Sequence, residues 1–189
     1  EEKTKAILIK FEKKTVALPF VLSALDFESL DVCYEKEAKG KDYNAILAEC
    51  KAAWNKVLGK IRVEGGDEAR KRVFYTEVYR ATSRMHNYSV NGKYFGFDKK
   101  MHDDEGHAYY CDDGIWDTFR GMHPLQLILE PEVHRDTIES YLRMYKESGW
   151  LPRFPYLGGN VPCMIGHHTV SILAESAAKG VDFDLELAY

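Results

Sequence analysis

The segment Tyr110–Leu125 carries the densest group of chemically useful side chains in this sequence. Trp116, Asp117 and Arg120 fall within five residues at the start of an apolar run. An exposed indole offers a flat apolar surface to the face of a sugar ring, while a carboxylate and a guanidinium group hold hydroxyls by hydrogen bonds. The segment therefore either lines a sugar-binding cleft or packs helices together, and residue types alone do not choose.

Each of these side chains also has a structural explanation. On a helix, Trp116 and Arg120 would lie one turn apart and share a face. Asp117 in a first helical turn would be favoured by the positive end of the helix dipole. Arg120 would be a structural brace if it paired with Asp113 or Asp117.

Trp150 and His168 are the next candidates. Trp150 comes directly after a predicted helix end, where it is either a sugar platform or a packing residue. His167 and His168 open the last predicted helix, and neighbouring helical side chains point about 100° apart, so the pair does not suit a single metal ion. We expect one imidazole to face the cleft, or both to be structural.

Other motifs give weaker indications. Residues 101–107 hold two imidazoles and three carboxylates in one contiguous run, which lacks metal-ligand spacing and is more typical of a solvated loop. The sequence has no glycine-rich phosphate loop, G-x-S-x-G elbow or H-E-x-x-H helix. We assign no catalytic residue and no metal ligand from these patterns.

Composition limits the classes of protein. A chain of 189 residues, 45% hydrophobic and 13% aromatic, can bury a substantial core in one domain. Its net charge of -4 argues against a nucleic-acid-binding surface and against a polybasic membrane patch. No apolar stretch approaches the roughly 20 residues of a membrane span. The four cysteines form no C-x-x-C pair, and buried free thiols are favoured over disulfides.

Periodicity predicts a mainly helical fold after a short extended or β N-terminal segment. Residues 6–11 and 16–25 have strand character. Apolar side chains at helical spacing predict helices from Asp42 to about 61, from Asp67 to about 85, over 116–130 with a bend at Pro124, over 131–148 and over 168–179. Residues 87–114 and 150–166 read as long loops with short strands. Paired helices with elaborated loops on one rim suggest a partial (α/α)6 toroid over 42–189.

Several blocks together resemble glycoside hydrolase family 92, the calcium-dependent exo-acting α-mannosidases. They are Phe74–Arg80, Gly92–Asp98, Trp116–Arg120 with His123–Leu125, and Gly149–Pro152 followed by Cys163–His168 and Lys179–Gly180. The third block is close to W-D-T-x-R-x-x-x-P-L of the family. Arg80 replaces a histidine expected in the family, and Val170 stands where an acidic residue is expected.

The resemblance implies a fragment of an inverting α-mannosidase, with residues 1–41 as the tail of a β-sandwich or a linker. Trp116 and Asp117 would belong to the terminal-mannose pocket, and His168 matches a motif histidine. Arg120 matches a motif arginine that would either bind substrate, as Trp150 would, or serve as a structural brace. A calcium ion would hold the mannose 2- and 3-hydroxyls. The partners would be mannose-containing glycans, and the location would be secreted or at the cell envelope.

The G-N-E-P and N-D-D-x-G segments that carry the family's acid and base do not occur in the sequence. The resemblance therefore implies that both catalytic groups lie beyond Tyr189, and we expect the chain to be inactive alone. Its uncovered apolar helix faces are expected to bind the missing half of the toroid or a second copy. The alternatives are a non-catalytic carbohydrate-binding or interaction module, or a fragment of another (α/α)6 carbohydrate-active enzyme.

Overall fold

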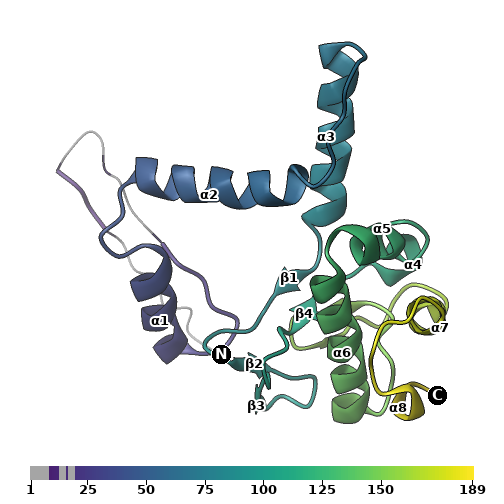
Figure 1. The fold of residues 1–189 in the computed structure, drawn as a ribbon. Coiled ribbons are helices and arrows are strands. Elements are labelled where there is room, and N and C mark those ends of the chain that lie inside the picture. Colours follow the sequence, from purple (N-terminus) through teal and green to yellow (C-terminus); the bar gives the residue numbers. More distant parts are fainter. Residues whose placement is uncertain (1–8, 13–15, 17–19) are drawn as a thin grey trace.

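The computed structural model describes residues 9–12, 16 and 20–189, and over these residues the chain is mainly helical (Figure 1). The helices are α1 (Phe27–Glu37), α2 (Tyr43–Leu58), α3 (Glu68–Thr82), α4 (Ile115–Thr118), α5 (Met122–Leu129), α6 (Pro131–Ser148), α7 (His168–Ala178) and α8 (Leu185–Ala188). The strands are β1 (His86–Asn87), β2 (Lys93–Phe95), β3 (Met101–Asp103), β4 (Tyr110–Cys111), β5 (Pro155–Tyr156) and β6 (Gly159–Asn160). They form three antiparallel pairs, β1 with β4, β2 with β3 and β5 with β6.

Aspartate side chains begin the first three helices. The carboxylates of Asp42 and Asp67 each accept a hydrogen bond from the backbone N–H three residues later, which confirms the predicted starts of α2 and α3. Asp26 and Ser29 form a reciprocal capping box at the start of α1. Helix α1 follows the two regions predicted to be strands, 6–11 and 16–25. In the parts of these regions that the structure describes, residues 9–11, 16 and 20–25, no strand forms, and the rest lies outside the described residues.

The predicted helix over 116–130 is two helices, and Pro124 does not bend it. Helix α4 ends at Thr118, and Gly121 precedes α5. Pro124 lies in the first turn of α5, where a missing backbone N–H removes no helical hydrogen bond. The break therefore comes from the residues between the helices. In α6, Pro131 opens the first turn and Gly149 ends the helix in the left-handed conformation, as predicted.

The core is built around α6. Ile138, Tyr141, Leu142 and Met144 on this helix are at most 1% exposed. They pack with Ile172 and Leu173 of α7 and with buried side chains of the 94–115 region, which are Tyr94, Phe97, Tyr109, Cys111 and Ile115. The core thus joins α6 and α7 to the long loop that leads into the Trp116 segment.

Helices α1, α2 and α3 extend away from the body formed by α4 to α8 (Figure 1). The rings of Trp54 in α2 and Tyr79 in α3 lie 4.4 Å apart. After α2, Lys60 pairs with Glu130 at 2.8 Å, at the junction of α5 and α6. None of the helices in the described part of the chain is long and apolar enough to cross a bilayer.

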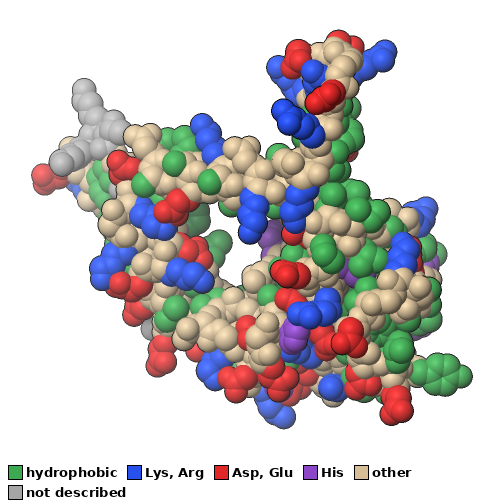
Figure 2. All heavy atoms as spheres, viewed as in Figure 1, with side chains coloured by type: hydrophobic (Ala, Val, Ile, Leu, Met, Phe, Trp, Pro, Cys, Tyr) green, Lys and Arg blue, Asp and Glu red, His purple; other side chains and the backbone are tan. Residues whose placement is uncertain are grey.

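The apolar faces of α2 and α3 are largely exposed. The helical spacing of Val73, Phe74 and Val78 predicts that they share a buried face, and of these three only Val78 is buried. Val78 is the only buried side chain in α3, and no side chain of α2 is buried. Tyr43 is 76% exposed and Val73 62% exposed. Figure 2 shows hydrophobic side chains at the surface of both helices, and an opening between α2 and the body of the molecule. Exposed apolar faces of this kind favour association.

We predict that the isolated chain self-associates through these faces. Light scattering over a dilution series should give a mass above 21.7 kDa, the mass of one chain. Val73→Glu should shift the equilibrium toward the monomer, because it places a charge within the apolar face. Thr76→Glu is the matched control, since it adds the same charge at an exposed polar position of α3. A wild-type protein that stays monomeric at all concentrations would contradict the prediction.

Candidate functional site

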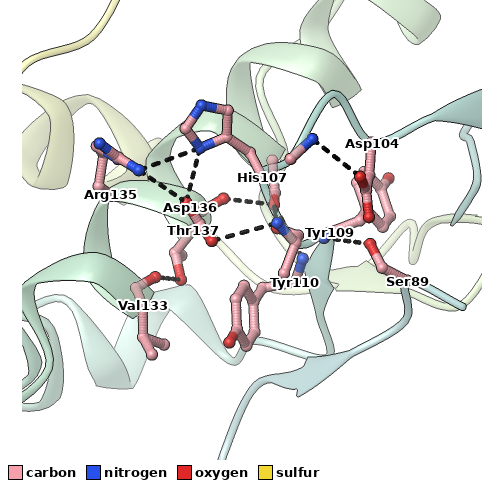
Figure 3. A network of polar contacts seen from close by, with 12 residues as sticks. Ser89, Asp104, His107, Tyr109, Tyr110, Val133, Arg135, Asp136 and Thr137 are labelled. Atoms are coloured by element: carbon pink, nitrogen blue, oxygen red, sulfur yellow. Dashed lines mark hydrogen bonds and ion pairs between the residues drawn. The ribbon is translucent and has the colours of Figure 1, made fainter. Parts of the chain in front are cut away.

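The loop before the Trp116 segment is fixed to α6 by polar side chains (Figure 3). Asp136 accepts a hydrogen bond from His107 Nδ1 at 2.9 Å, and Ser140 Oγ accepts one from the backbone N–H of Tyr110 at 2.9 Å. One helical turn further, Arg143 Nη1 donates to the carbonyl oxygen of His107 at 3.0 Å. Strand β4 is therefore held along one face of α6, and the chain that follows it starts from a fixed position.

Asp113 is the buried anchor of the segment. Its carboxylate is 0% exposed and accepts hydrogen bonds from Thr118 Oγ1 at 2.7 Å, from His123 Nε2 at 2.8 Å and from the hydroxyl of Tyr141. Burial, and then the negative charge of Asp113, raises the pKa of Tyr141 well above its ordinary value, so this hydroxyl stays a donor. The three donors come from α4, α5 and α6, which Asp113 thereby ties together.

A second buried histidine lies behind this anchor. The rings of His123 and His134 are 5.8 Å apart, and Nε2 of His134 lies 2.8 Å from Ser176 Oγ of α7. Because Ser176 Oγ donates to the carbonyl oxygen of Ile172, it accepts from His134. Burial, and then the charge of His123, lowers the pKa of His134 to about 4. His134 is therefore neutral at physiological pH.

Trp116 and Asp117 lie side by side at the surface end of this anchored helix. Trp116 is half-buried and its ring packs edge-to-face on Phe154 at 4.7 Å. The side chain of Asp117 is 70% exposed and pairs with Arg120 at 3.3 Å. Since α4 ends at Thr118, Arg120 lies beyond the helix, and the expected shared helical face with Trp116 does not form. An exposed pair of this type contributes little stability, about 1 kcal/mol or less.

His168 is brought to the same region by α7. Its imidazole stacks on Phe119, with the ring centroids 4.2 Å apart and an interplanar angle of 9°. Gly166, with a φ of 83°, permits this position, because a Cβ atom there would lie 2.5 Å from His168 Nε2. His167 precedes α7 and makes no side-chain capping bond. Of the two adjacent histidines, His168 is the one placed beside the Trp116 segment.

Trp150 and the histidines of 101–107 are placed differently. Trp150 is 75% exposed and has no ring partner among the side chains that the structure describes. His102 pairs with Asp98 at 2.9 Å and His107 with Asp136. Over residues 9–12, 16 and 20–189, no three His, Cys, Asp or Glu side chains are grouped to hold a metal ion. Cys33 and Cys111 are buried free thiols, whereas Cys50 and Cys163 are exposed.

The structure thus gathers Trp116, Asp117, Arg120 and His168 around one end of α4, and leaves Trp150 as an exposed side chain further along. A hollow of about 540 Å³ lies elsewhere, between the β2–β3 hairpin and α6. It is lined by none of these residues. Sequence reasoning missed Asp113, Phe119 and Phe154 as supports, because their partners are distant in the sequence.

Tyr189, the last residue of the chain, is not part of this surface. It follows α8, its side chain is fully exposed, and it lines a small hollow with Phe183 and Leu185. None of the side chains gathered around α4 lines that hollow. The acid and base that the family resemblance implies beyond Tyr189 stay a prediction, and we assign neither role to Tyr189 itself.

An accessible indole and an exposed carboxylate at one surface suit a carbohydrate. The indole of Trp116 can pack on the C–H face of a sugar ring, and Asp117, beside Arg120, can accept hydrogen bonds from hydroxyls. Residues 32–189 match the sequence profile of the glycosyl hydrolase family 92 catalytic domain. The chain belongs to glycosyl hydrolase family 92.

Solved structures agree with family 92. The chain is similar to a family GH92 α-mannosidase from Bacteroides thetaiotaomicron, with a TM-score of 0.83 and 34% identity over 88% of this chain and 23% of that one. A structure of that enzyme in complex with mannoimidazole gives the same score and identity, over 22% of its length. A family GH92 inverting mannosidase from the same organism gives 0.80 and 32%, over 88% of this chain and 23% of its own.

The chain therefore spans less than a quarter of the length of these family 92 structures. No curated protein is similar enough to the chain to count as a match.

Gly166→Ala should move His168 off Phe119. The added Cβ would collide with the imidazole, which is the flexible partner, and the positive φ adds strain of about 1–2 kcal/mol. The ring-current shift of the His168 protons, measured by NMR, should therefore decrease. Gly180→Ala is the matched control, because its φ of 79° is similar and no atom lies within 4 Å of the added Cβ. An unchanged His168 shift in Gly166→Ala would show that the contact is absent in solution.

Stability should fall as the pH drops from about 6.5 toward 4, because His134 is protonated only in the unfolded chain over this range. The unfolded state then binds more protons, so the free energy of unfolding rises with pH, by at most about 1.4 kcal/mol per unit for one group. Urea unfolding at a series of pH values measures the slope. His134→Gln should flatten it, whereas His167→Gln, at an exposed position, should not. If the free energy of unfolding had the same slope against pH in wild type and in His134→Gln, the lowered pKa of His134 would be refuted.

Proposed function

We propose that this chain supplies part of the terminal-mannose-binding surface of a hydrolase that acts on α-mannosides. The observation that carries the proposal is the pair Trp116 and Asp117, which is accessible to solvent on an anchored helix in a chain of family 92. The related solved structures are named as α-mannosidases, and one of them holds mannoimidazole. These names support mannose as the sugar to test first.

Each residue then has a defined role. Trp116 packs on the apolar face of the mannose ring, and Asp117 accepts hydrogen bonds from its hydroxyls. Arg120 orients the Asp117 carboxylate, with which it already pairs at 3.3 Å. His168, held against Phe119, adds a hydrogen-bonding group at the edge of the same surface. Trp150, as an exposed indole, is a rim contact for the rest of the glycan.

We further propose that hydrolysis inverts the anomeric configuration. An inverting glycosidase uses one carboxylic acid to protonate the leaving oxygen and one carboxylate to activate water, about 6.5–9.5 Å apart. We assign neither group to this chain, because the G-N-E-P and N-D-D-x-G sequences do not occur in its 189 residues, and we propose that both follow Tyr189 in the whole enzyme. The chain alone is therefore proposed to bind sugar without hydrolysing it. Its paired helices are proposed as part of an (α/α)6 toroid.

The family also implies calcium. In the portion of the chain that the structure describes, the acidic and histidine side chains do not fit such a site, because no three of them are grouped. Asp113, the most buried carboxylate near the surface described above, already accepts three hydrogen bonds. We therefore propose calcium for the whole enzyme only, at a site outside the described residues of this chain. Export to the cell envelope or exterior is likewise proposed from the family, and cell fractionation would check it.

The second candidate is an interaction module, and the exposed faces of α2 and α3 favour it. A chain that only associates with other polypeptides would show self-association without sugar binding. A fragment of another type of (α/α)6 enzyme is the weaker alternative, because the profile of family 92 matches residues 32–189. Sugar binding therefore separates the two functions that remain.

Titration with mannose and with mannoimidazole, followed by calorimetry and by NMR of the indole N–H groups, tests the proposed function. We expect Trp116→Ala and Asp117→Asn to weaken binding at least about tenfold, which corresponds to about 1.4 kcal/mol. Trp54→Phe is the matched control, because Trp54 stacks on Tyr79 in the α2–α3 arm. Glucose, which differs from mannose only at C2, checks that binding depends on the hydroxyl pattern.

Two outcomes would contradict the proposal. Mannose and mannoimidazole binding that is absent, or unaffected by Trp116→Ala, would remove the sugar-binding role and leave the interaction module. Release of mannose from a synthetic aryl α-mannoside by the purified chain would show that it carries its own acid and base.

A further inference from the structure

We propose that His86, oriented by Asp112 and flanked by Tyr88, forms a second sugar contact that binds the unit next to the terminal mannose. The inference rests on the proposed function, because it extends the Trp116 surface to a neighbouring position. Asp112 Oδ2 accepts a hydrogen bond from the hydroxyl of Tyr88 and lies 3.1 Å from His86 Nδ1. Residues from β1 and from the turn after β4 meet in this cluster.

The backbone at Asp112 is held in an unusual conformation. Its φ is 71°, in the left-handed region that residues other than glycine rarely adopt. Strain of this kind costs on the order of 1 kcal/mol and persists where the surrounding structure fixes the residue. Here the next residue, Asp113, is the buried anchor. The turn therefore directs one carboxylate inward, toward α5 and α6, and the other toward His86 and Tyr88.

The cluster presents one imidazole nitrogen to solvent. The side chain of Asp112 is 13% exposed, whereas that of His86 is 63% exposed. A carboxylate only accepts hydrogen bonds, so Nδ1 of His86 carries the proton when the ring is neutral, and Nε2 is left as an acceptor. Nε2 has no partner among the residues that the structure describes. A fixed, exposed acceptor of this type suits a sugar hydroxyl.

Tyr88 gives the cluster a second polar group and an apolar face. Burial, and then the hydrogen bond to Asp112, raises the pKa of Tyr88 above its ordinary value, so the hydroxyl stays protonated. Its ring and that of His86 meet edge-to-face at 6.4 Å. Tyr88 also lines a hollow of about 410 Å³ together with Leu157. Tyr88, which shares the Asp112 carboxylate with His86, therefore borders a space that a ligand can enter.

The β5–β6 hairpin connects this cluster to the Trp116 surface. Phe154, just before β5, carries the Trp116 ring, and Leu157 in the hairpin turn lines the hollow beside Tyr88. Three residues of extended chain span about 10 Å, which is comparable to the length of a disaccharide. Tyr156, between them, is 55% exposed. Asp112, the partner of His86, also precedes Trp116 by only four residues, so we infer that a glycan whose terminal ring rests on Trp116 extends its second ring toward His86.

Binding of mannose and of the α-linked mannobioses to the full chain, measured by calorimetry, tests this inference. Wild type should bind at least one mannobiose more tightly than mannose. His86→Ala should reduce that advantage about five- to tenfold and leave the affinity for mannose unchanged. Asp112→Asn should act in the same direction, because Asp112 is a positioning residue for His86. His102→Ala is the matched control, since His102 forms a similar pair with Asp98 on a different hairpin.

The outcomes separate this inference from the proposed function. Mannose binding that depends on Trp116, together with a disaccharide advantage that His86→Ala leaves intact, would overturn the second contact alone. A wild-type chain that binds no mannobiose more tightly than mannose would do the same. Equal losses of affinity for mannose and mannobiose in His86→Ala would indicate that the imidazole contacts the terminal sugar. This result would overturn its assignment to the second sugar unit. Absence of all mannose binding would refute both the proposed function and the second sugar contact.

His86→Gln keeps a hydrogen-bond acceptor, so it should restore part of the affinity advantage for mannobiose. Circular dichroism checks that this variant is folded.

Discussion

The hydrogen bonds of the buried Asp113 carboxylate are the interaction on which the rest of this structure depends. A charge without solvent is costly unless donors surround it. Thr118, His123 and Tyr141 supply those donors from three different helices. The positions of α4, α5 and α6 are therefore coupled, because displacement of any one of them would leave the carboxylate short of a partner. Apolar packing around α6 holds these helices together, and Asp113 fixes how they are aligned.

The exposed surface beside α4 follows from this anchor. A helix of one turn is not stable by itself. Trp116 and Asp117 keep their places because Ile115 is buried in the core, Thr118 is bonded to Asp113 and the Trp116 ring rests on Phe154. The turn at Asp112 buries the Asp113 carboxylate and directs the Asp112 carboxylate toward His86. One strained turn thus supports both the Trp116 surface and the polar cluster that we propose beside it, which explains why two neighbouring carboxylates have different surroundings.

The Trp116 surface and the exposed faces of α2 and α3 both lie within residues 32–189, the part of the chain that matches family 92. The alignment with a family GH92 α-mannosidase structure covers 88% of this chain and 23% of that one. Helices α2 and α3 lie within the residues that match the family and still expose their apolar faces. The Trp116 surface and the exposed helix faces are separate features of the chain, since the first is polar and aromatic and the second is mainly apolar.

The sequence by itself determined the elements whose causes are local. Asp42 and Asp67 as caps, Pro131 and Gly149 at the ends of α6, and the motif residues of the family could be read without coordinates, because each depends on neighbours within a few residues. The tertiary structure decided which side chains are buried and which side chains contact one another. The burial of Asp113, the exposure of Val73 and the stacking of His168 on Phe119 depend on which distant segments meet, and helical periodicity shows which residues share a face but not what covers it.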